Sequence, residues 1–260
     1  MRKVATVLFR PPNASSGAGS KPFADDMAAH PDVTGNHFLD SLPGADREAL
    51  RPFLTVEEIQ HGQLVSAVGA EVAFVYFPVT AILSLTIHMV DGQGVETSTI
   101  GRESGYGLLN ALGDRTSWNE VYSQVGGRCY RLSADRLRQA ALDSPAVMGQ
   151  IVRHAQANAA QIDQSVACNA FHPVEARLCR WLLMSHDRAG ASALPLTPEF
   201  LGFMLGVQRT TVTAAAQALQ SAGLIRYRRG NIDIVDRKGL EHGACECYAA
   251  VQQKLGHILS

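Results

Sequence analysis

The chain has 260 residues, of which 46% are hydrophobic and 18% charged, and its formal net charge is −1. This composition is typical of one large or two medium globular domains. It excludes a membrane-spanning helix, because no apolar run approaches the roughly 18–20 residues that cross a bilayer. The five cysteines are odd in number and scattered, which favours reduced thiols in the cytoplasm over a disulfide framework.

The N-terminal segment is expected to have no fold. Residues 10–36 are rich in Pro, Gly, Ser and Ala and contain almost no large apolar side chains. Such a composition cannot bury enough apolar surface to offset the entropy lost on ordering. The apolar run Val4–Phe9 is too short for the core of a signal peptide, and no small-residue cleavage site follows it closely. We therefore predict a disordered tail over residues 1–35 of a cytoplasmic protein.

A β-rich region is predicted to follow two short helices. The segment His37–Leu54 has apolar residues at helical spacing, and Pro43-Gly44 divides it. From Val56 to Tyr130, short runs of β-branched and aromatic residues alternate with turn signals. Many short strands at close spacing favour a small barrel or sandwich, most simply a jelly roll. The expected strands include Val72–Phe77, Ala81–Val90, Val95–Ile100 and Glu120–Tyr130.

Helices are predicted at Ser133–Ala141 and at Ser144–Ala170. In the longer one, apolar and small residues recur at alternating steps of three and four, which is the seam expected when two helices pack along their length. The alternative is that this face is buried inside the chain itself. The candidate dimerisation residues are Met148, Ile151, Ala155, Asn158 and Ile162, and Ser165 continues the pattern.

The C-terminal part is predicted to begin at a hinge. His172-Pro173 should end the long helix, because the residue before a proline disfavours helical geometry. A further helix is expected at Val174–Met184, and a single amphipathic helix at Gly239–Leu259. The predicted fold class is therefore α+β, with a β-barrel domain over residues 36–142, a dimerisation helix and hinge over 143–172, and a C-terminal domain over 173–260.

The pattern after Thr197 is that of a helix-turn-helix. Thr197 is a good N-cap for a first helix, and Gly206 can take the positive φ of a tight interhelical turn. A second helix is expected to begin near Gln208. Gly202 and Val212 fall at the offsets where the two helices of such a unit approach and pack.

A short basic hairpin follows the two helices. Leu224–Arg228 and Asn231–Val235 are β-type runs joined by Arg229-Gly230. From Thr197 to Lys238 there are six Lys or Arg residues and three acidic ones, a net of +3 in a chain whose total is −1. Positive charge is thus concentrated where DNA phosphates would be met. We interpret the segment as a winged helix-turn-helix that binds DNA, and the alternative is a plain helical hairpin beside an unrelated β ribbon.

The order of β-barrel, long helix, hinge and winged helix resembles the Crp/Fnr superfamily of bacterial transcription regulators. The resemblance covers about residues 36–238, and its most specific part is the run LGFMLGVQRTTVTAAAQAL, residues 201–219. It implies a cyclic-nucleotide-binding-like barrel that acts as a sensor, no catalysis, and a homodimer on a palindromic site in double-stranded DNA, with RNA polymerase as a further partner. The paired recognition helices would enter successive major grooves about 34 Å apart.

The resemblance carries over to the recognition helix in part. The Ser-Arg-Glu-Thr-Val-like start of the family is Gln-Arg-Thr-Thr-Val here, residues 208–212. Arg209 matches the arginine that reaches O6 and N7 of a guanine, whereas Thr210 replaces an acidic residue, so the operator is expected to differ from the familiar ones. The wing arginines look like phosphate contacts. The candidate DNA-binding residues are Gln208, Arg209, Thr210, Thr213, Gln217, Arg228 and Arg229.

The resemblance is weaker in the sensor. Cyclic-nucleotide binders of the family carry a Gly-Glu pair for the ribose, but Gly105 is followed by Tyr106 here. Arg115-Thr116 resembles the pair that holds the phosphate, and Arg115 could equally be a solvated loop residue. Gln161–Asp163 lacks the hydroxyl pair that meets the base of cyclic AMP. Cyclic AMP is therefore disfavoured and the effector is unknown, with Gly105, Arg115 and Thr116 as the candidate effector-binding residues.

The cysteines and histidines indicate no metal or haem motif. On a continuous helix, the thiols of Cys245 and Cys247 would point about 200° apart, so a shared metal ion would need local unwinding and further ligands. The tail contains no cysteine, unlike that of the cluster-binding members of the family. Cys129, Cys168 and Cys179 lie among apolar residues and are expected to be core side chains. We expect no metal ligand among them, and haem ligation by one of the nine histidines stays open.

Two other functions are compatible with the sequence. A ligand-binding or protein-interaction module could have a winged domain that does not bind DNA. A cupin-type enzyme is the weaker alternative, because cupin metal sites need clustered His and Glu on strands, and His88 stands almost alone between Val56 and Tyr130.

Overall fold

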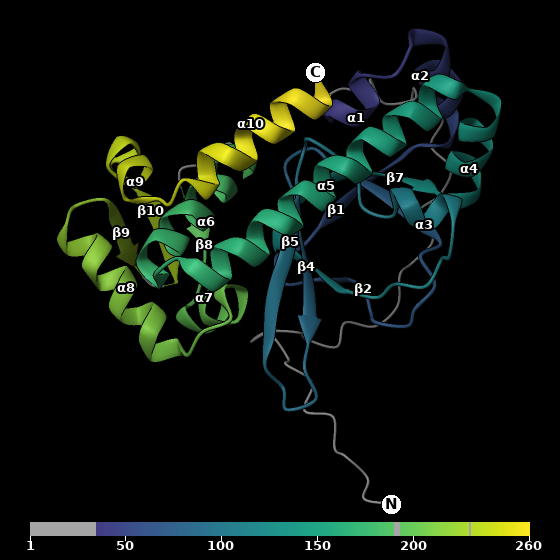
Figure 1. Cartoon of the computed structure of the whole chain (residues 1–260). Coiled ribbons are helices and arrows are strands. Elements are labelled where there is room, and N and C mark those ends of the chain that lie inside the picture. The colour runs from purple at the N-terminus through teal and green to yellow at the C-terminus, as the bar shows by residue number, and fades with distance from the viewer. Residues whose placement is uncertain (1–34, 190–192, 229) are drawn as a thin grey trace, which may run out of the picture.

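The computed structural model describes residues 35–189, 193–228 and 230–260. The chain begins with short helices, forms two β-sheets, and continues through one long helix into a helical domain with a small sheet (Figure 1). This arrangement confirms the predicted α+β fold class. The predicted tail, residues 1–35, lies outside the described part except for Gly35. Within that part, the helices are too short or too polar to cross a membrane.

Two antiparallel sheets form a sandwich of the jelly-roll kind. The strand order is β1-β7-β3 in one sheet and β2-β6-β4-β5 in the other. Leu83 and Val121 from one sheet and Cys129 from the other belong to the same buried cluster. The strands are β1 (Thr55–Ile59), β2 (Leu64–Ser66), β3 (Phe74–Pro78), β4 (Ile82–His88), β5 (Gly94–Ile100), β6 (Glu120–Val125) and β7 (Gly127–Ser133).

The predicted strand Glu120–Tyr130 is in fact two strands, because the chain passes from one sheet to the other at Gly126-Gly127. A Cβ at Gly126 would lie 2.8 Å from the backbone N of His61. A Cβ at Gly127, where φ is +155°, would lie 2.5 Å from Oγ1 of Thr80. Only glycine allows backbones to approach this closely, so the glycine pair is what lets β6 and β7 join different sheets.

Short helices cover the sandwich at its ends. The predicted division of His37–Leu54 is confirmed, because α1 and α2 lie on either side of Pro43. Phe38 is fully buried and stacks on Phe77 at a ring-centroid distance of 5.3 Å. No sequence pattern predicted α3. The helices are α1 (His37–Asp40), α2 (Gly44–Leu50), the 3-10 turn Arg51–Phe53, α3 (Leu108–Leu112) and α4 (Ala134–Asp143).

The long helix α5 (Pro145–Phe171) lies where it was predicted and is capped by Ser144, whose hydroxyl accepts from the Val147 N–H at 3.4 Å. One face of α5 packs on the β-domain, so Val147 and Ile151 are fully buried in its core. The expectation that Ile151 faces a second copy of the chain is therefore wrong. The heptad-like spacing is real, but it fits the inward-facing residues as well as a seam.

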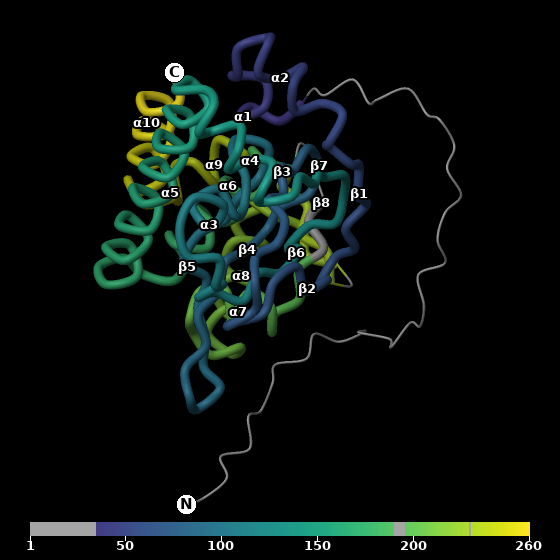
Figure 2. Tube along the Cα trace, turned by 90° about the vertical axis from the view of Figure 1, so that its right-hand side faces the viewer, coloured from purple at the N-terminus to yellow at the C-terminus, as the bar shows by residue number. Residues whose placement is uncertain are grey.

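The C-terminal segment is two helices rather than the single helix expected. α9 (Arg237–Gly243) ends, Ala244 is extended with φ −75° and ψ 149°, and α10 (Cys247–Leu259) begins in a new direction. α10 lies beside α5 in both Figure 1 and Figure 2. Nζ of Lys254 donates to Oε1 of Gln164 at 2.8 Å, which links the two helices.

The helical domain is built around α6 (Val174–Ala189), which follows Pro173 as predicted and runs past the expected end at Met184. Leu178 and Leu182 on α6 are fully buried and share a core with Val212 and Leu219. The remaining elements are α7 (Pro198–Leu205), α8 (Arg209–Ser221) and a sheet of order β8-β10-β9, made of β8 (Ala193–Pro195), β9 (Ile225–Arg228) and β10 (Asn231–Ile234).

Candidate nucleic-acid interface

The turn between α7 and α8 has the geometry of a helix-turn-helix. Oγ1 of Thr197 accepts a hydrogen bond from the Phe200 N–H at 3.2 Å and caps α7. Gly206 ends α7 with φ +63°, a conformation that costs an L-residue energy. A Cβ at Gly202 would lie 3.0 Å from the carbonyl oxygen of Val207, so the approach of the chain here requires a small residue. These local predictions are confirmed.

α8 presents one face to the domain core and the opposite face to solvent. The inward face holds the apolar residues predicted for it, which are Val212, Ala215, Ala216 and Leu219. α8 lies on the outer side of the domain, away from the β-sandwich (Figure 1). Four of the candidate DNA-binding residues of this segment are exposed, and they are Gln208, Arg209, Thr210 and Gln217. The fifth, Thr213, is half-buried, and its Oγ1 donates to the Arg209 carbonyl at 2.8 Å.

Arg209 forms an exposed ion pair with Glu199 on α7. Nη1 of Arg209 lies 2.6 Å from Oε1 of Glu199, and the two side chains are 68% and 44% exposed. An ion pair this open to water contributes about 0–1 kcal/mol. The acceptors of a guanine could therefore replace the carboxylate at little cost, and Glu199 orients the guanidinium at the start of α8 without locking it there.

β9 and β10 form the predicted wing. Arg228 is opposite Asn231 in the strand register, so a two-residue connection joins the strands. Arg228 is exposed, while the other wing candidate, Arg229, lies outside the described residues. The Tyr227 N–H donates to Oε1 of Gln220 at 2.7 Å. This bond ties the wing to the last turns of α8, so these two elements form one unit.

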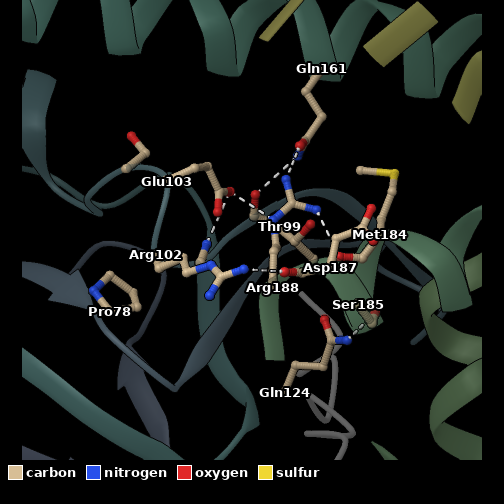
Figure 3. Close-up of polar contacts among 12 residues, drawn as sticks. Pro78, Thr99, Arg102, Glu103, Gln124, Gln161, Met184, Ser185, Asp187 and Arg188 are labelled. Carbon is tan, nitrogen blue, oxygen red and sulfur yellow. Dashed lines mark hydrogen bonds and ion pairs between the residues drawn. The ribbon is translucent and has the colours of Figure 1, made fainter. Parts of the chain in front are cut away.

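A buried polar network joins this domain to the rest of the chain (Figure 3). Nε of Arg188 on α6 lies 2.7 Å from Oε1 of Glu103, and its Nη2 donates to Oε1 of Gln161 on α5 at 2.7 Å. Nε2 of Gln161 in turn donates to the Thr99 carbonyl on β5 at 3.1 Å. Burial by itself would raise the pKa of Glu103, but the charge of Arg188 holds that pKa below its ordinary value. Arg188 is thus a buried cation shared by three elements.

Two hydrogen bonds extend this network along the polar face of α6. Nε2 of Gln124 on β6 donates to the hydroxyl of Ser185 at 2.7 Å, and Nη2 of Arg102 donates to the Asp187 carbonyl at 3.1 Å (Figure 3). Sequence reasoning missed this face, because it ended the helix at Met184. The available signal was the run after Met184, because Ser185, His186, Asp187 and Arg188 follow it with no proline or glycine to end the helix.

Trp181 makes a further contact between α6 and the β-domain. Its Nε1 donates to Oε1 of Glu96 on β5 at 2.8 Å, and the hydroxyl of Ser84 on β4 donates to the other carboxylate oxygen at 2.5 Å. Burial raises the pKa of Glu96 to about 7, and these two hydrogen bonds oppose the rise. A carboxyl group that titrates near neutral pH therefore lies between the two domains.

The candidate effector-binding residues are engaged within the protein. The guanidinium of Arg115 pairs with Asp135 on α4, and its Nη1 lies 3.7 Å from Oε1 of Glu71. Thr116 forms an isolated β-bridge with Glu71. Gly105 is packed against a β3 aromatic ring, whose nearest atom would lie 2.9 Å from an added Cβ. A phosphate at Arg115 would compete with the Asp135 and Glu71 carboxylates, which are themselves 78% and 67% exposed.

The helix-turn-helix segment matches a known domain. Residues 176–242 match the family described as the Crp-like helix-turn-helix domain. The match runs from α6 through α7, α8 and the wing into α9. Among curated proteins, none matches the chain by sequence.

Solved structures match most of the chain. FixK2 from Bradyrhizobium japonicum has a TM-score of 0.63 at 16% identity, over 74% of this chain and 98% of that one. The c-di-GMP responsive global regulator CLP of Xanthomonas campestris gives 0.61 at 16% identity, over 74% and 99%. A CRP/FNR-family transcriptional regulator from Thermus thermophilus gives 0.61 at 18% identity, over 73% and 98%. The chain therefore has the fold of the Crp/Fnr regulators and carries a Crp-like helix-turn-helix domain, with its DNA-binding unit, at residues 176–242.

Proposed function

We propose that this chain is a sequence-specific transcription regulator that binds a palindromic DNA site as a homodimer, with RNA polymerase as the machinery it acts on. The observation that carries the proposal is the exposed N-terminal end of α8, on a helix whose other face is fixed in the core of a Crp-like domain. In helix-turn-helix proteins this end reads base edges. In this proposal Arg209 contacts a guanine and the wing arginines contact phosphates.

A solvent-facing stripe on α5 supports the homodimer. Val152 is 46% exposed and Val166 is 65% exposed, while Met148 and Ile162, the other large apolar members, are half-buried. α10 contacts α5 through Gln164, which lies two residues from both Ile162 and Val166. Residues two apart on a helix differ in direction by about 200°, so α10 packs on the side of α5 away from the stripe and leaves it uncovered. The stripe alternates steps of four and three and consists of Met148, Val152, Ala155, Ala159, Ile162 and Val166.

This stripe replaces part of the seam expected from the sequence. Met148, Ala155 and Ile162 belong to both, but Val152 and Ala159 take the places given to Ile151 and Asn158. The alanines permit two helices to approach closely, and a two-fold axis between them presents two copies of α8 to one face of a duplex. A symmetric pair of recognition helices is matched by a palindromic site.

Selection from a random duplex library, followed by fluorescence anisotropy on the selected site, tests the proposal. The full chain should enrich a palindrome and lose affinity for it steeply, by about 10³-fold or more between 50 and 200 mM salt, as counterions are released. The alternative is a ligand-binding or protein-interaction module with a winged domain that does not bind DNA. Enrichment of no duplex, with weak binding that salt leaves unchanged, would establish that alternative.

The sensor is proposed not to respond to cyclic AMP. The contacts of two residues support this: the Arg115 guanidinium pairs with two carboxylates, and Gln161 is hydrogen-bonded to Arg188 and Thr99. Isothermal titration of the full chain with cyclic AMP should give no heat of binding at millimolar ligand. Saturable binding would show that these contacts open.

A further inference from the structure

Four candidate metal ligands meet where the long helix ends. Cys168 and His172 are four residues apart at the end of α5, and Cys245 and Cys247 lie at the start of α10. One ligand atom from each lies within 4.8 Å of all the others. Sγ of Cys168 is 3.5 Å from Sγ of Cys245, and Sγ of Cys247 is 3.5 Å from Nδ1 of His172. The three thiols are buried, and the imidazole is half-buried.

The break between α9 and α10 is what brings the two C-terminal thiols to the same side. The expectation of no metal ligand rested on a continuous helix, in which residues two apart point in nearly opposite directions. Here Cys245 lies outside both helices, although Glu246 already has helical φ and ψ, so a continuous helix does not set the direction of the Cys245 side chain. Residues four apart on a helix share a face, which places Cys168 and His172 together on α5.

We propose that Cys168, His172, Cys245 and Cys247 bind one Zn²⁺ ion in a closed tetrahedral site. Three thiolates and one imidazole are a known structural zinc set, with Zn–S bonds of about 2.3 Å and Zn–N bonds of about 2.0–2.1 Å. Tetrahedral bonds of this length set ligand atoms about 3.5–3.8 Å apart. The two observed separations of 3.5 Å agree with this, so a small contraction of the cluster completes the site. An iron–sulfur cluster distributes its cysteines over several irons and needs a wider spacing.

Neighbouring side chains orient the ligands in the way that zinc sites require. Nε2 of His172 lies 3.1 Å from Oε1 of Glu246, which fixes the proton on Nε2 and leaves Nδ1 free to bind the metal. Nε2 of Gln164 donates to Sγ of Cys247 at 3.1 Å. Oε1 of Gln164 is in turn held by Lys254. Such second contacts commonly contribute 10–100-fold to metal affinity.

The charge of the site is also compensated. Binding releases the protons of three thiols, and three thiolates around Zn²⁺ leave a net charge of −1. Arg177 and Arg180 are buried on α6, and the positive charge of each acts on Cys168. In the part of the chain that the structure describes, neither guanidinium lies within 4.0 Å of a carboxylate oxygen. The charge of Arg180 also acts on Glu96, and the zinc complex would add a negative charge beside both buried cations.

The position of the site gives it a mechanical role. His172 ends α5 at the hinge, and Cys247 begins α10, after the wing and α9. A bound ion would therefore join the end of α5 to the start of α10, two segments that the helix-turn-helix and the wing separate along the chain. This role concerns the structure of the hinge and does not depend on whether the wing binds DNA.

Metal analysis of the full chain, purified under reducing conditions, tests the proposal. We expect one zinc per chain by mass spectrometry of the metals, and the same content in Cys129→Ser, which alters a buried free cysteine outside the group. Cys245→Ser should lose stoichiometric zinc, and Glu246→Gln should bind zinc about tenfold more weakly in competition with a chelator. Wild-type protein without stoichiometric zinc, or equal zinc in Cys245→Ser, would overturn the assignment.

Cobalt substitution decides the question even if Cys245→Ser fails to fold. Apo wild-type chain titrated with Co²⁺ should show the intense visible bands of tetrahedral cobalt and a thiolate-to-cobalt charge-transfer band, both saturating at one ion per chain. Zinc should then displace the cobalt. Weak octahedral bands, visible absorption from iron and sulfide in the purified protein, or a Cys168–Cys245 disulfide that persists under reducing conditions would each contradict a zinc site.

Discussion

At the residue scale, the positive φ of Gly206 leads to a prediction about stability. Gly206→Ala should lower the free energy of unfolding by about 1–2 kcal/mol, because the left-handed region costs an L-residue that much. Gly149 is the matched control, since it lies in α5 with no atom within 4 Å of an added Cβ, so Gly149→Ala should be neutral or stabilising by up to about 1 kcal/mol. Urea unfolding followed by tryptophan fluorescence measures both, and equal effects would contradict the argument.

The sequence predicts single residues best where the backbone accepts few residue types. Thr197 as a cap and Gly206 as a turn follow from local rules, and both are found in those roles. Arg188 and its partners could not be predicted in this way. They are 27 and 85 positions apart along the chain, and no local pattern marks polar residues that meet only in the tertiary structure. The candidate interface was therefore predictable in its turn and helix, while the polar face of α6 was not.

Arg209 is expected to carry sequence preference. Arg209→Ala should reduce discrimination at one base pair of the selected site by about 1–3 kcal/mol, because a bidentate contact to guanine is lost. Arg228→Ala should instead weaken all sequences alike and reduce the salt slope by about 1. Arg138→Ala on α4, exposed and remote from α8, is the control and should change neither. Footprints of Arg209→Ala that match the wild type would show that α8 is not the reading helix.

At the scale of elements, periodicity located the helices but did not assign their faces. α5 has two stripes at heptad-like spacing, one buried on the β-domain through Val147 and Ile151 and one open through Val152 and Val166. Both follow the same alternation, so the sequence could not tell which faces a partner. Likewise, the apolar stripe of Gly239–Leu259 continues across the break at Ala244, although α9 packs on α6 and α10 packs mainly on α5. Faces and breaks are decided by tertiary packing.

The contact between α6 and β5 should depend on pH through Glu96. Its pKa is raised by burial from 4.5 to about 7 in the folded chain, so the folded state binds more protons than the unfolded state between those values. Stability is therefore expected to fall as pH rises from about 5 to 7. Glu96→Gln keeps an acceptor for Trp181 and removes the titration, so its melting temperature should lack this part of the fall. Parallel profiles for wild type and variant would contradict the assignment.

At the scale of the whole molecule, the open stripe of α5 is expected to hold two copies together. Val152→Glu places a charge in the middle of that stripe and should weaken dimerisation at least tenfold, as loss of a central apolar contact commonly does. Leu142→Glu on α4 is the matched control, since Leu142 is 66% exposed and lies outside the stripe, and it should leave assembly unchanged. Sedimentation velocity over a concentration series separates the two outcomes. A monomeric wild type would remove the basis for a palindromic site.

The amide of Gln161 has a consequence for how the molecule can move. One side chain on α5 holds both the Thr99 backbone and the Arg188 guanidinium (Figure 3). Rotation of α5, or a slide by one helical turn, breaks both bonds together and leaves a buried cation without its amide partner. Intermediate positions are therefore disfavoured, and the two domains should separate in a single step rather than by degrees. We therefore expect Gln161 to make both hydrogen bonds or neither.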